Sequence, residues 1–290
     1  MTISERIAIT GATGQLGRLV IAELLRIAPA AHLIGIVRNA SAAKDLAERG
    51  VELRTANYDD PDAIKAALAG ADKVLLISSS EIGQRVRQHG NVIDAAKAAA
   101  VKLLAYTSIL HADTSPLALA EEHRGTEALI RASGVPFVLL RNGWYTENYT
   151  GNVAAAIQHG AVLGAAGHGR ISLAARADYA AAAAAVLASR ETQAGRICEL
   201  AGDNGYTLAD YAAEISRQSG KPIVYKDLPE AEYKAALESI GLPEAFAALL
   251  ADSDANAAKG ALYDDSRQLS GLIGHPTTPM AHSVAAALAR

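Results

Sequence analysis

A glycine-rich turn near the N-terminus constrains this chain more than any other feature. The short apolar run Ile7–Ile9 is followed by glycines in the spacing G-x-x-G-x-x-G, at Gly11, Gly14 and Gly17. A strand, a tight turn and an amphipathic helix in this order place the positive end of the helix dipole against a phosphate. We expect Gly11 to allow the turn, Gly14 to let a pyrophosphate approach and Gly17 to let the helix pack closely on the sheet. The spacing departs from the commoner G-x-G-x-x-G, so a tight turn without a ligand is the alternative.

Composition excludes several other classes of protein. The chain has 290 residues, half of them apolar, which allows one large or two small domains with a sizeable core. Its net charge is −4 and no basic block stands out, so nothing indicates a nucleic-acid partner. Cys198 is the only cysteine, which excludes an intramolecular disulfide and makes a cysteine-based metal site implausible. The apolar runs are shorter than the roughly 20 residues of a membrane span, and the first strand leaves no room for a signal peptide. We therefore expect a soluble, globular, cytoplasmic protein.

The first half of the chain alternates between apolar runs and helical segments. The apolar runs predict buried parallel strands at Ile7–Ile9, Leu33–Val37, Val51–Thr55, Val74–Ile77, Leu103–Tyr106 and Phe137–Leu140. The expected helices are Leu16–Ile27, Ser41–Arg49 with Ser41 as N-cap, Pro61–Leu68 between Asp60 and Gly70, Gln84–Ala100, and Leu117–Ala132. Such alternation predicts the α/β class, with a Rossmann-type, doubly wound parallel sheet covered on both faces.

After about Trp144 this alternation ends. The expected helices are 151–160, 174–189, 207–219, 230–239 and 243–251, with a short strand in the glycine-rich 160–169 and another at 197–201. This pattern predicts a smaller, mostly helical C-terminal lobe that closes over the nucleotide. The predicted nucleotide-binding domain comprises residues 1–143 and about 174–202, and the lobe comprises 144–173 and 203–290. A single domain over 1–290 is the alternative.

Ligands of open parallel sheets bind at the carboxyl ends of the strands, so the residues there are the candidates. Arg38 ends the second strand, where an acidic side chain would hold the ribose hydroxyls of NAD. A guanidinium binds a 2′-phosphate instead, which predicts NADPH as the cofactor; the alternative is an exposed arginine without a ligand.

Other strand ends add further candidates. Asn57 follows the third strand and is either a contact to adenine or a turn residue. Ser78, Ser79 and Ser80 follow the fourth and either border the ribose or nicotinamide or simply begin a loop. The sixth strand ends in Arg141–Tyr145, where the Arg, Asn, Trp and Tyr side chains offer donors for a carboxamide and flat faces for a planar substrate. The complete set of predicted cofactor contacts is Gly11, Ala12, Thr13, Gly14, Gln15, Leu16, Arg38, Ser78, Ser79, Ser80, Asn142, Gly143, Trp144 and Tyr145.

These stretches resemble a known family, the NmrA-like group of atypical short-chain dehydrogenases. The stretches that carry the resemblance are Thr10–Gly17, Val37–Asn39, Leu76–Ser80, Ala105–Ser108 and Leu140–Tyr145. Within the group, the chain is similar to the bacterial type 2 NAD(P)H:quinone oxidoreductases along nearly its whole length, including 111–116, 176–179, 250–254 and 274–278. The glycine motif is common to many dehydrogenases, whereas the stretches at 111–116 and 141–145 are narrower signals. The resemblance implies a Rossmann domain with a small C-terminal lobe, NADPH as cofactor and a quinone as acceptor.

One feature of the wider superfamily is missing. No tyrosine of this chain has a lysine four residues later, so the Tyr-x-x-x-Lys pair is absent, and His123 and Glu127 stand at i and i+4 where it would lie. Reduction of a ketone needs an acid, worth about 10²–10⁴-fold, because the alkoxide formed is strongly basic. Hydride transfer to a quinone gives a much less basic phenolate, so holding the rings within about 3–3.5 Å does most of the work. We expect direct reduction to hydroquinone, without a flavin and without a released radical.

The residue that supplies the final proton is left open. His123 is the first candidate for a catalytic role, with a solvent-facing histidine as the alternative. Ser108 either acts through its hydroxyl or positions the carbonyl, and Tyr145 either stacks on the quinone or packs within the lobe. His111 and Asp113 are expected in a structural turn, and Cys198 in the core.

Two other functions compete with the enzyme. Some NmrA-like proteins bind a dinucleotide without catalysing a reaction and act as redox sensors, which the missing Tyr-x-x-x-Lys suits equally well. A nucleotide-sugar epimerase or dehydratase is disfavoured, because its chemistry needs a strong base. The sequence predicts neither a membrane nor a nucleic acid as partner, and it leaves a homo-oligomer open.

Overall fold

The computed structural model describes residues 5–289, which form two compact units. The first unit comprises the described part of Met1–Ile109, together with Glu122–Asn142 and Tyr179–Cys198. The second comprises Leu110–Glu121, Gly143–Asp178 and the described part of Glu199–Arg290. The segment 110–121 therefore belongs to the second unit, whereas the sequence boundaries assign it to the nucleotide-binding domain.

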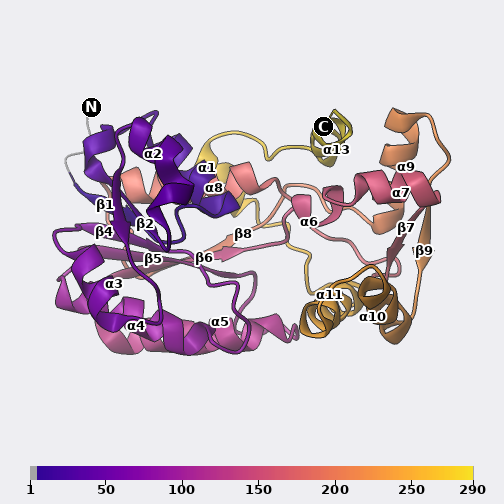
Figure 1. Cartoon of the computed structure of the whole chain (residues 1–290). Helices are drawn as coiled ribbons and strands as arrows, with labels where there is room; N and C mark the ends of the chain where they lie inside the picture. The colour runs from indigo at the N-terminus through magenta and orange to yellow at the C-terminus, as the bar shows by residue number, and fades with distance from the viewer. Residues whose placement is uncertain (1–4, 290) are drawn as a thin grey trace. The chain divides into compact units, whose positions relative to one another are not determined.

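A seven-stranded sheet in the order β3-β2-β1-β4-β5-β6-β8 organises the first unit (Figure 1). Its strands are β1 (Ile7–Ile9), β2 (Leu33–Val37), β3 (Glu52–Thr55), β4 (Lys73–Leu76), β5 (Leu103–Ile109), β6 (Phe137–Asn142) and β8 (Arg196–Leu200). β1 pairs in parallel with both β2 and β4, so that Ala8 faces Ile34 on one side and Val74 on the other. The strand order reverses at β1, which is where this kind of sheet opens a ligand crevice. The predicted Rossmann-type fold is confirmed.

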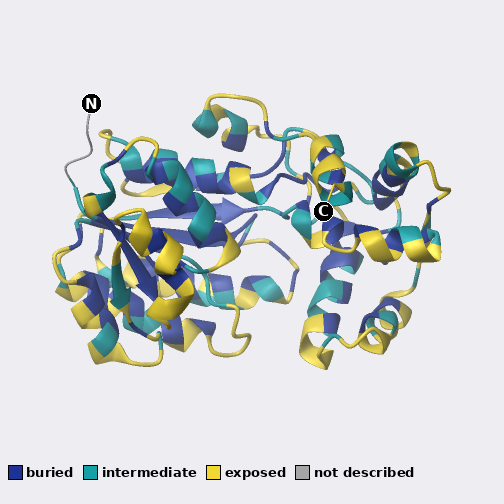
Figure 2. Ribbon diagram, turned by 45° about the horizontal axis from the view of Figure 1, so that its top comes forward, coloured by how far each residue is buried: buried dark blue, intermediate teal, exposed yellow. Residues whose placement is uncertain are grey.

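Helices cover both faces of this sheet, with α1, α2 and α8 on one face and α3, α4 and α5 on the other (Figure 1). Their bounds are α1 (Gln15–Leu24), α2 (Lys44–Glu48), α3 (Pro61–Leu68), α4 (Arg85–Ala98), α5 (Leu119–Ser133) and α8 (Arg176–Ala188), with 3-10 helices at Ala30–His32 and Ala40–Ala43. Much of the sheet is buried between these layers (Figure 2). Residues of β1, β2, β4 and β5 form one apolar cluster with α3 and α4, and burial of this area is the main stabilising contribution.

The cap of the second helical segment differs from the prediction. Ser41 lies inside the 3-10 helix Ala40–Ala43, and Asn39 is the capping residue, because its Oδ1 accepts from Ser41 N at 2.9 Å. Asn and Ser are both good N-caps, and Asn39 comes first along the chain. At α3 the prediction is correct, since the Asp60 carboxylate accepts from Ala63 N at 3.0 Å and Pro61 occupies the first turn.

The second unit is mostly helical. It contains a two-stranded parallel sheet of β7 (Ala161–Gly164) and β9 (Val224–Asp227), in which Val162 pairs with Tyr225. Its helices are α6 (Glu147–Thr150), α7 (Val153–His159), α9 (Leu208–Ser219), α10 (Glu230–Ser239), α11 (Glu244–Ala257), α12 (Gln268–Ile273) and α13 (Met280–Leu288). Thr207 and Asp210 form a capping box at the start of α9, as their spacing indicates. The strand β9 and the helices α6, α12 and α13 are not among the predicted elements. No helix in residues 5–289 has the length and apolar character needed to cross a membrane.

Candidate functional site

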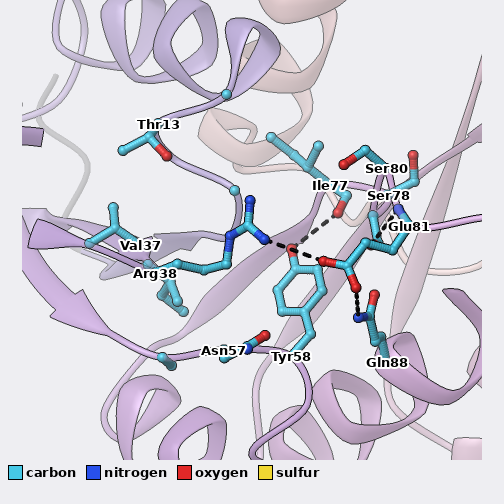
Figure 3. A pocket seen from close by; sticks show the side chains of 15 residues that line it. Thr13, Val37, Arg38, Asn57, Tyr58, Ile77, Ser78, Ser80, Glu81 and Gln88 are labelled. Atoms are coloured by element: carbon cyan, nitrogen blue, oxygen red, sulfur yellow. Dashed lines mark hydrogen bonds and ion pairs between the residues drawn. The ribbon is translucent and has the colours of Figure 1, made fainter. Parts of the chain in front are cut away.

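A pocket of about 410 Å³ opens in the first unit where β1, β2, β3 and β4 end. The glycine turn, the end of β2 and the segment after β4 supply most of its walls, and Figure 3 shows the labelled side chains around it. The residues that line it are Gly11, Thr13, Gly14, Ile36, Val37, Arg38, Ala56, Asn57, Tyr58, Ile77, Ser78, Ser79, Ser80, Glu81 and Gln88. This is the edge of the sheet where the sequence places the cofactor.

The glycine turn leaves the first turn of α1 open to a ligand. Gly11 has a φ of 59°, a left-handed conformation that favours glycine, and Gly14 is the N-cap of α1 without a capping side chain. A Cβ on Gly14 would lie 3.1 Å from the Gly11 carbonyl oxygen. The backbone N–H groups of α1 and this space without side chains suit an anionic group such as a pyrophosphate.

Gly17 has a different role from the predicted one. A Cβ on Gly17 would lie 2.3 Å from the Gly11 carbonyl oxygen and 3.0 Å from the Ala12 Cα. The close approach that requires glycine is therefore to the turn itself, whereas the sequence assigns it to packing on the sheet.

The other predicted contacts in this turn do not line the pocket with their side chains. Ala12 and Leu16 are buried, and Ala12 N donates to Ile36 O at 3.2 Å. Gln15 is exposed and begins α1. Any contact that Leu16 makes to a phosphate would run through its backbone N–H, as at other helix N-termini, whereas the Ala12 N–H is already bonded to Ile36 O.

The segment after β4 is held by side chains from the turn after β1, from β5 and from α4. Ile77 N donates to Thr10 Oγ1 at 3.0 Å, Ser78 N to Thr107 Oγ1 at 2.9 Å, and Ser79 N to His89 Nε2 at 2.9 Å. Each of these N–H groups would otherwise pair with a neighbouring strand or with water. The wall formed by Ser78–Ser80 is therefore positioned by buried groups that the sequence analysis did not select.

His89 holds this wall as a neutral ring. Burial is the main cause that lowers its pKa to about 3, and the charge of Arg85 lowers it further. Nε2 accepts from Ser79 N, so the proton is on Nδ1, which lies 2.9 Å from Thr126 Oγ1 and donates to it. Arg85 Nε donates to Ser79 O at 2.5 Å, so the Ser79 residue is held at both its N–H and its carbonyl.

Tyr58 and Arg38 also line the pocket and reach toward the segment after β4. The Tyr58 hydroxyl donates to Thr10 Oγ1 and lies 3.1 Å from Ile77 O, and burial raises its pKa well above the usual value. The Arg38 side chain is exposed and its Nη1 lies 3.3 Å from Glu81 Oε1 (Figure 3). The guanidinium thus extends over the pocket from the end of β2, where a 2′-phosphate is expected.

His123 is buried, so the solvent-facing alternative is wrong. It is 4 % exposed, its Nδ1 lies 2.8 Å from the Tyr106 hydroxyl, and burial lowers its pKa to about 3. Tyr106 keeps its proton, since burial raises its pKa. A ring with this pKa is neutral at pH 7, which is a physical argument against His123 as proton donor. That role stays an untested prediction.

Ser108 belongs to a buried ion-pair network between β5, α5 and β6. Its Oγ donates to Glu127 Oε1 at 2.6 Å, and Arg141 donates to both Glu127 oxygens, from Nε at 2.9 Å and from Nη2 at 2.8 Å. All three side chains are buried. With its hydrogen committed to the carboxylate, the Ser108 oxygen can only accept a further hydrogen bond, so it is suited to positioning a donor group.

The predicted contacts after β6 are divided between the two units. Asn142 ends β6 in the first unit, and Gly143, Trp144 and Tyr145 belong to the second. Gly143 N donates to Leu200 O at 2.7 Å, and Trp144 is buried. Tyr145 is half-buried, with the Arg176 guanidinium 4.7 Å from its ring centre. Of the predicted cofactor contacts, those that share the described pocket are Gly11, Thr13, Gly14, Arg38, Ser78, Ser79 and Ser80.

The remaining candidates have structural positions in the described chain. His111 begins a turn at a φ of 52°, where its carbonyl accepts from Thr114 N and Ser115 N, and its Nε2 lies 3.0 Å from Asp264 Oδ2. Cys198 is buried in β8. Within residues 5–289 no three His, Cys, Asp or Glu side chains converge as a metal site would require.

A buried carboxylate in the second unit, Asp254, is not among the predicted site residues, although 250–254 is one of the stretches that carry the family resemblance. Asp254 Oδ1 accepts from the Tyr149 hydroxyl at 2.9 Å and its Oδ2 from Ala165 N at 3.1 Å. Burial raises the pKa of Asp254 to about 6. Its partners lie about 90 and 105 residues earlier in the chain, so no local sequence pattern could have indicated it.

Comparison with known proteins places the chain in a family. The model of the NmrA-like family matches residues 3–271. The chain belongs to the NmrA-like family. It is 57% identical to Quinone oxidoreductase 2 of Escherichia coli K12 over 96% of this chain and 97% of that protein. This confirms the resemblance found in the sequence.

Solved structures agree with that assignment. A crystal structure described as the NADPH-dependent quinone oxidoreductase QOR2 of Escherichia coli complexed with NADPH has a TM-score of 0.95 at 56% identity, covering 97% of this chain and 99% of that one. The triphenylmethane reductase of Citrobacter sp. complexed with NADP(H) has a TM-score of 0.92 at 38% identity, covering 97% and 99%. Relatives in two structures therefore carry the cofactor that Arg38 predicts.

Proposed function

We propose that this chain is an NADPH-dependent quinone reductase that gives a hydroquinone by direct hydride transfer. The observation that carries the proposal is the 57% identity to Quinone oxidoreductase 2 over 96% of the chain. The pocket of the first unit supports it, because it combines an open helix N-terminus with an arginine at the end of β2. Its partner is a small-molecule quinone, with neither a nucleic acid nor a membrane required.

The residues of the pocket fit the pyrophosphate and adenosine half of NADPH. The N–H groups at the start of α1 and the absence of a side chain on Gly14 accommodate the pyrophosphate. Arg38 supplies a guanidinium for the 2′-phosphate, and Ser78–Ser80 border the ribose from a wall that buried side chains hold. Asn142, Gly143, Trp144 and Tyr145 stay proposed contacts to the nicotinamide half or the quinone.

The chemistry needs little acid–base help from the chain. When bound, NADPH supplies a hydride from its nicotinamide ring. The phenolate formed from a quinone is a weak base, so the missing Tyr-x-x-x-Lys pair costs little, and the chain contributes chiefly by holding the reactants at reacting distance. Ser108 is suited to accept from a donor group, because Glu127 takes its hydroxyl hydrogen. His123 and Tyr145 stay candidates for catalysis, with His123 disfavoured by its neutral, buried ring.

The proposal is tested by the loss of NADPH absorbance at 340 nm with a simple benzoquinone. We expect turnover well above the uncatalysed rate, an equal amount of hydroquinone, and no dependence on added flavin. Spin-trapping should find no radical as the main first product. Loss of NADPH only at the uncatalysed rate, with tight NADPH binding retained, would contradict catalysis and favour the redox sensor instead.

A redox sensor is the second candidate, and it is favoured by one observation, the missing Tyr-x-x-x-Lys pair. The identity to Quinone oxidoreductase 2 along almost the whole chain favours the enzyme. We also propose a cytoplasmic location, where cells maintain NADPH, and light scattering of the purified chain decides between a monomer and a homo-oligomer.

A further inference from the structure

Two side chains of opposite charge meet within the cofactor pocket. Arg38 follows β2 and Glu81 follows β4, and both line the pocket. Arg38 Nη1 lies 3.3 Å from Glu81 Oε1, and Figure 3 shows the two side chains extending toward each other. The guanidinium proposed for the 2′-phosphate thus already has an anionic partner inside the protein.

The Glu81 carboxylate is held in this place by a buried amide. Gln88 Nε2 donates to Glu81 Oε2 at 2.8 Å, and Gln88 is 1% exposed. The orientation of this amide is settled, because Nε2 also lies 3.3 Å from both oxygens of Asp59 and carboxylates accept hydrogen bonds. Glu81 N donates to Ser79 Oγ at 3.1 Å, which ties residue 81 to the wall of the pocket.

We propose that Glu81 competes with the 2′-phosphate of NADPH for Arg38 and so limits the preference of the pocket for NADPH over NADH. This inference rests on the proposed function, specifically on Arg38 as the phosphate ligand. NADPH must take Arg38 from Glu81, whereas NADH, which lacks the phosphate, leaves the pair intact.

The 2′-phosphate can replace Glu81 as the partner of Arg38, but the replacement weakens the net binding of NADPH. The side chains of Arg38 and Glu81 are 74% and 43% exposed, so their ion pair is weak and a doubly charged phosphate displaces it. Once Arg38 has moved to the phosphate, its contact with Glu81 is lost. Loss of an exposed ion pair of this kind weakens binding of the phosphate by about twofold to fivefold.

The test compares two adenosine nucleotides that differ in the phosphate. Calorimetry measures the Kd of 2′,5′-ADP, which carries the 2′-phosphate, and of 5′-AMP, which does not. We expect Glu81→Gln to tighten 2′,5′-ADP by about twofold to fivefold and to leave 5′-AMP nearly unchanged, and to raise the NADPH preference of the full cofactors likewise. Glutamine still accepts from Gln88 Nε2, so this variant removes the charge and keeps the local hydrogen bond.

Glu48→Gln is the matched control, because Glu48 is exposed at the end of α2 and does not line the pocket. It removes the same charge and should change neither Kd. The gain of Glu81→Gln should shrink at about 0.5 M salt, since screening weakens interactions between exposed charges. Equal tightening of both nucleotides, no change, or the same gain in Glu48→Gln would overturn the proposal.

Variants of Arg38 separate this inference from the proposed function. Arg38→Met should remove most of the advantage of 2′,5′-ADP over 5′-AMP, and Glu81→Gln should have a smaller effect in that background. If Arg38→Met abolishes the advantage while Glu81→Gln tightens nothing, the competition is wrong and the phosphate site stands. If Arg38→Met leaves the advantage intact, the assignment of Arg38 itself is wrong. A full-sized effect of Glu81→Gln without Arg38 would also exclude competition for that residue.

Discussion

Thr10 is the residue on which the pocket wall most directly depends, and Thr10→Val tests its role. The side chain is fully buried, directly before the glycine turn. Its Oγ1 donates to Leu75 O at 3.1 Å and accepts from Ile77 N at 3.0 Å and from the Tyr58 hydroxyl. Valine has nearly the same shape but neither donates nor accepts.

The magnitude follows from the groups that valine would leave without a partner. Leu75 O keeps the hydrogen bond from Thr10 N at 3.0 Å, and Tyr58 can turn to Ile77 O at 3.1 Å. The part-buried Ile77 N–H loses its acceptor, which costs about 1–2 kcal/mol, the lower part of the range for a buried donor. The methyl group that replaces the hydroxyl returns up to about 0.8 kcal/mol by burial. We therefore expect Thr10→Val to lower the free energy of unfolding by about 1 kcal/mol.

Thr10→Ser is the matched control, since it keeps the hydroxyl and loses only a methyl group. Urea unfolding followed by circular dichroism should find Thr10→Val less stable than Thr10→Ser. Calorimetry should find NADPH binding weakened mainly in Thr10→Val, because the wall at Ser78–Ser80 begins at Ile77. Wild-type stability and affinity in Thr10→Val, or a loss in Thr10→Ser as large as in Thr10→Val, would refute this account of the wall.

Four further predictions test other parts of the structure. Arg38→Asp should shift the preference from NADPH toward NADH by about 1–3 kcal/mol, the scale of a lost charge-assisted contact, and an unchanged ratio of the two Kd values would exclude the phosphate role. Glu127→Ala leaves Arg141 buried without its carboxylate and should cost about 3–5 kcal/mol of stability in urea, whereas Arg131→Ala, which removes an exposed partner of the same carboxylate, should cost about 1 kcal/mol or less. His123→Gln should leave the pH profile of kcat unchanged between pH 5 and 8, and loss of an inflection in that range would show that His123 does supply the proton. Burial raises the pKa of Asp254 from 3.8 to about 6, so between these two values the folded chain binds a proton that the unfolded chain has released. The free energy of unfolding therefore falls as the pH rises through this range, by up to about 1.4 kcal/mol per pH unit. Asp254→Asn should lose this pH dependence, measured by the fluorescence of Trp144 in the same unit during urea unfolding.

The parts of the site that act through the backbone or through strand position were predictable from sequence. Gly11 and Gly14 lie at the predicted turn and Arg38 at the end of β2, because apolar runs and glycine spacing report local conformation directly. The seven-stranded sheet follows from the same periodicity, and its first two strands have the predicted bounds.

The longer strands show where that reasoning ends. β5 continues to Ile109 and β6 to Asn142, beyond the apolar runs that predict them, because Ser108 and Arg141 are buried polar residues paired through Glu127. A hydropathy pattern treats such residues as the end of a strand, since it does not include their partners on α5.

The side chains that position the pocket wall could not be predicted from the sequence either, because their partners come from other parts of the chain. Thr10 and Ile77 are 67 residues apart, and Thr107 and Ser78 are 29 apart. His89 accepts from Ser79 N only ten residues away, but nothing in the helical pattern around His89 predicts that its side chain turns back to this loop. These roles come from tertiary contacts, so they became evident only in the folded chain.

The resolved pKa shifts around the pocket wall and the β5–α5 layer agree with a site that works by position. His89 and His123 stay neutral down to about pH 3, and Tyr58 and Tyr106 keep their protons far above neutral pH. None of these four groups changes its charge between pH 5 and 8, so none is suited to give up a proton there. An acceptor that becomes a weakly basic phenolate tolerates this, because water can protonate it after hydride transfer, whereas an ordinary ketone would need a positioned acid. These four buried groups therefore offer no proton donor for an ordinary ketone near neutral pH, which is consistent with the proposed quinone as acceptor.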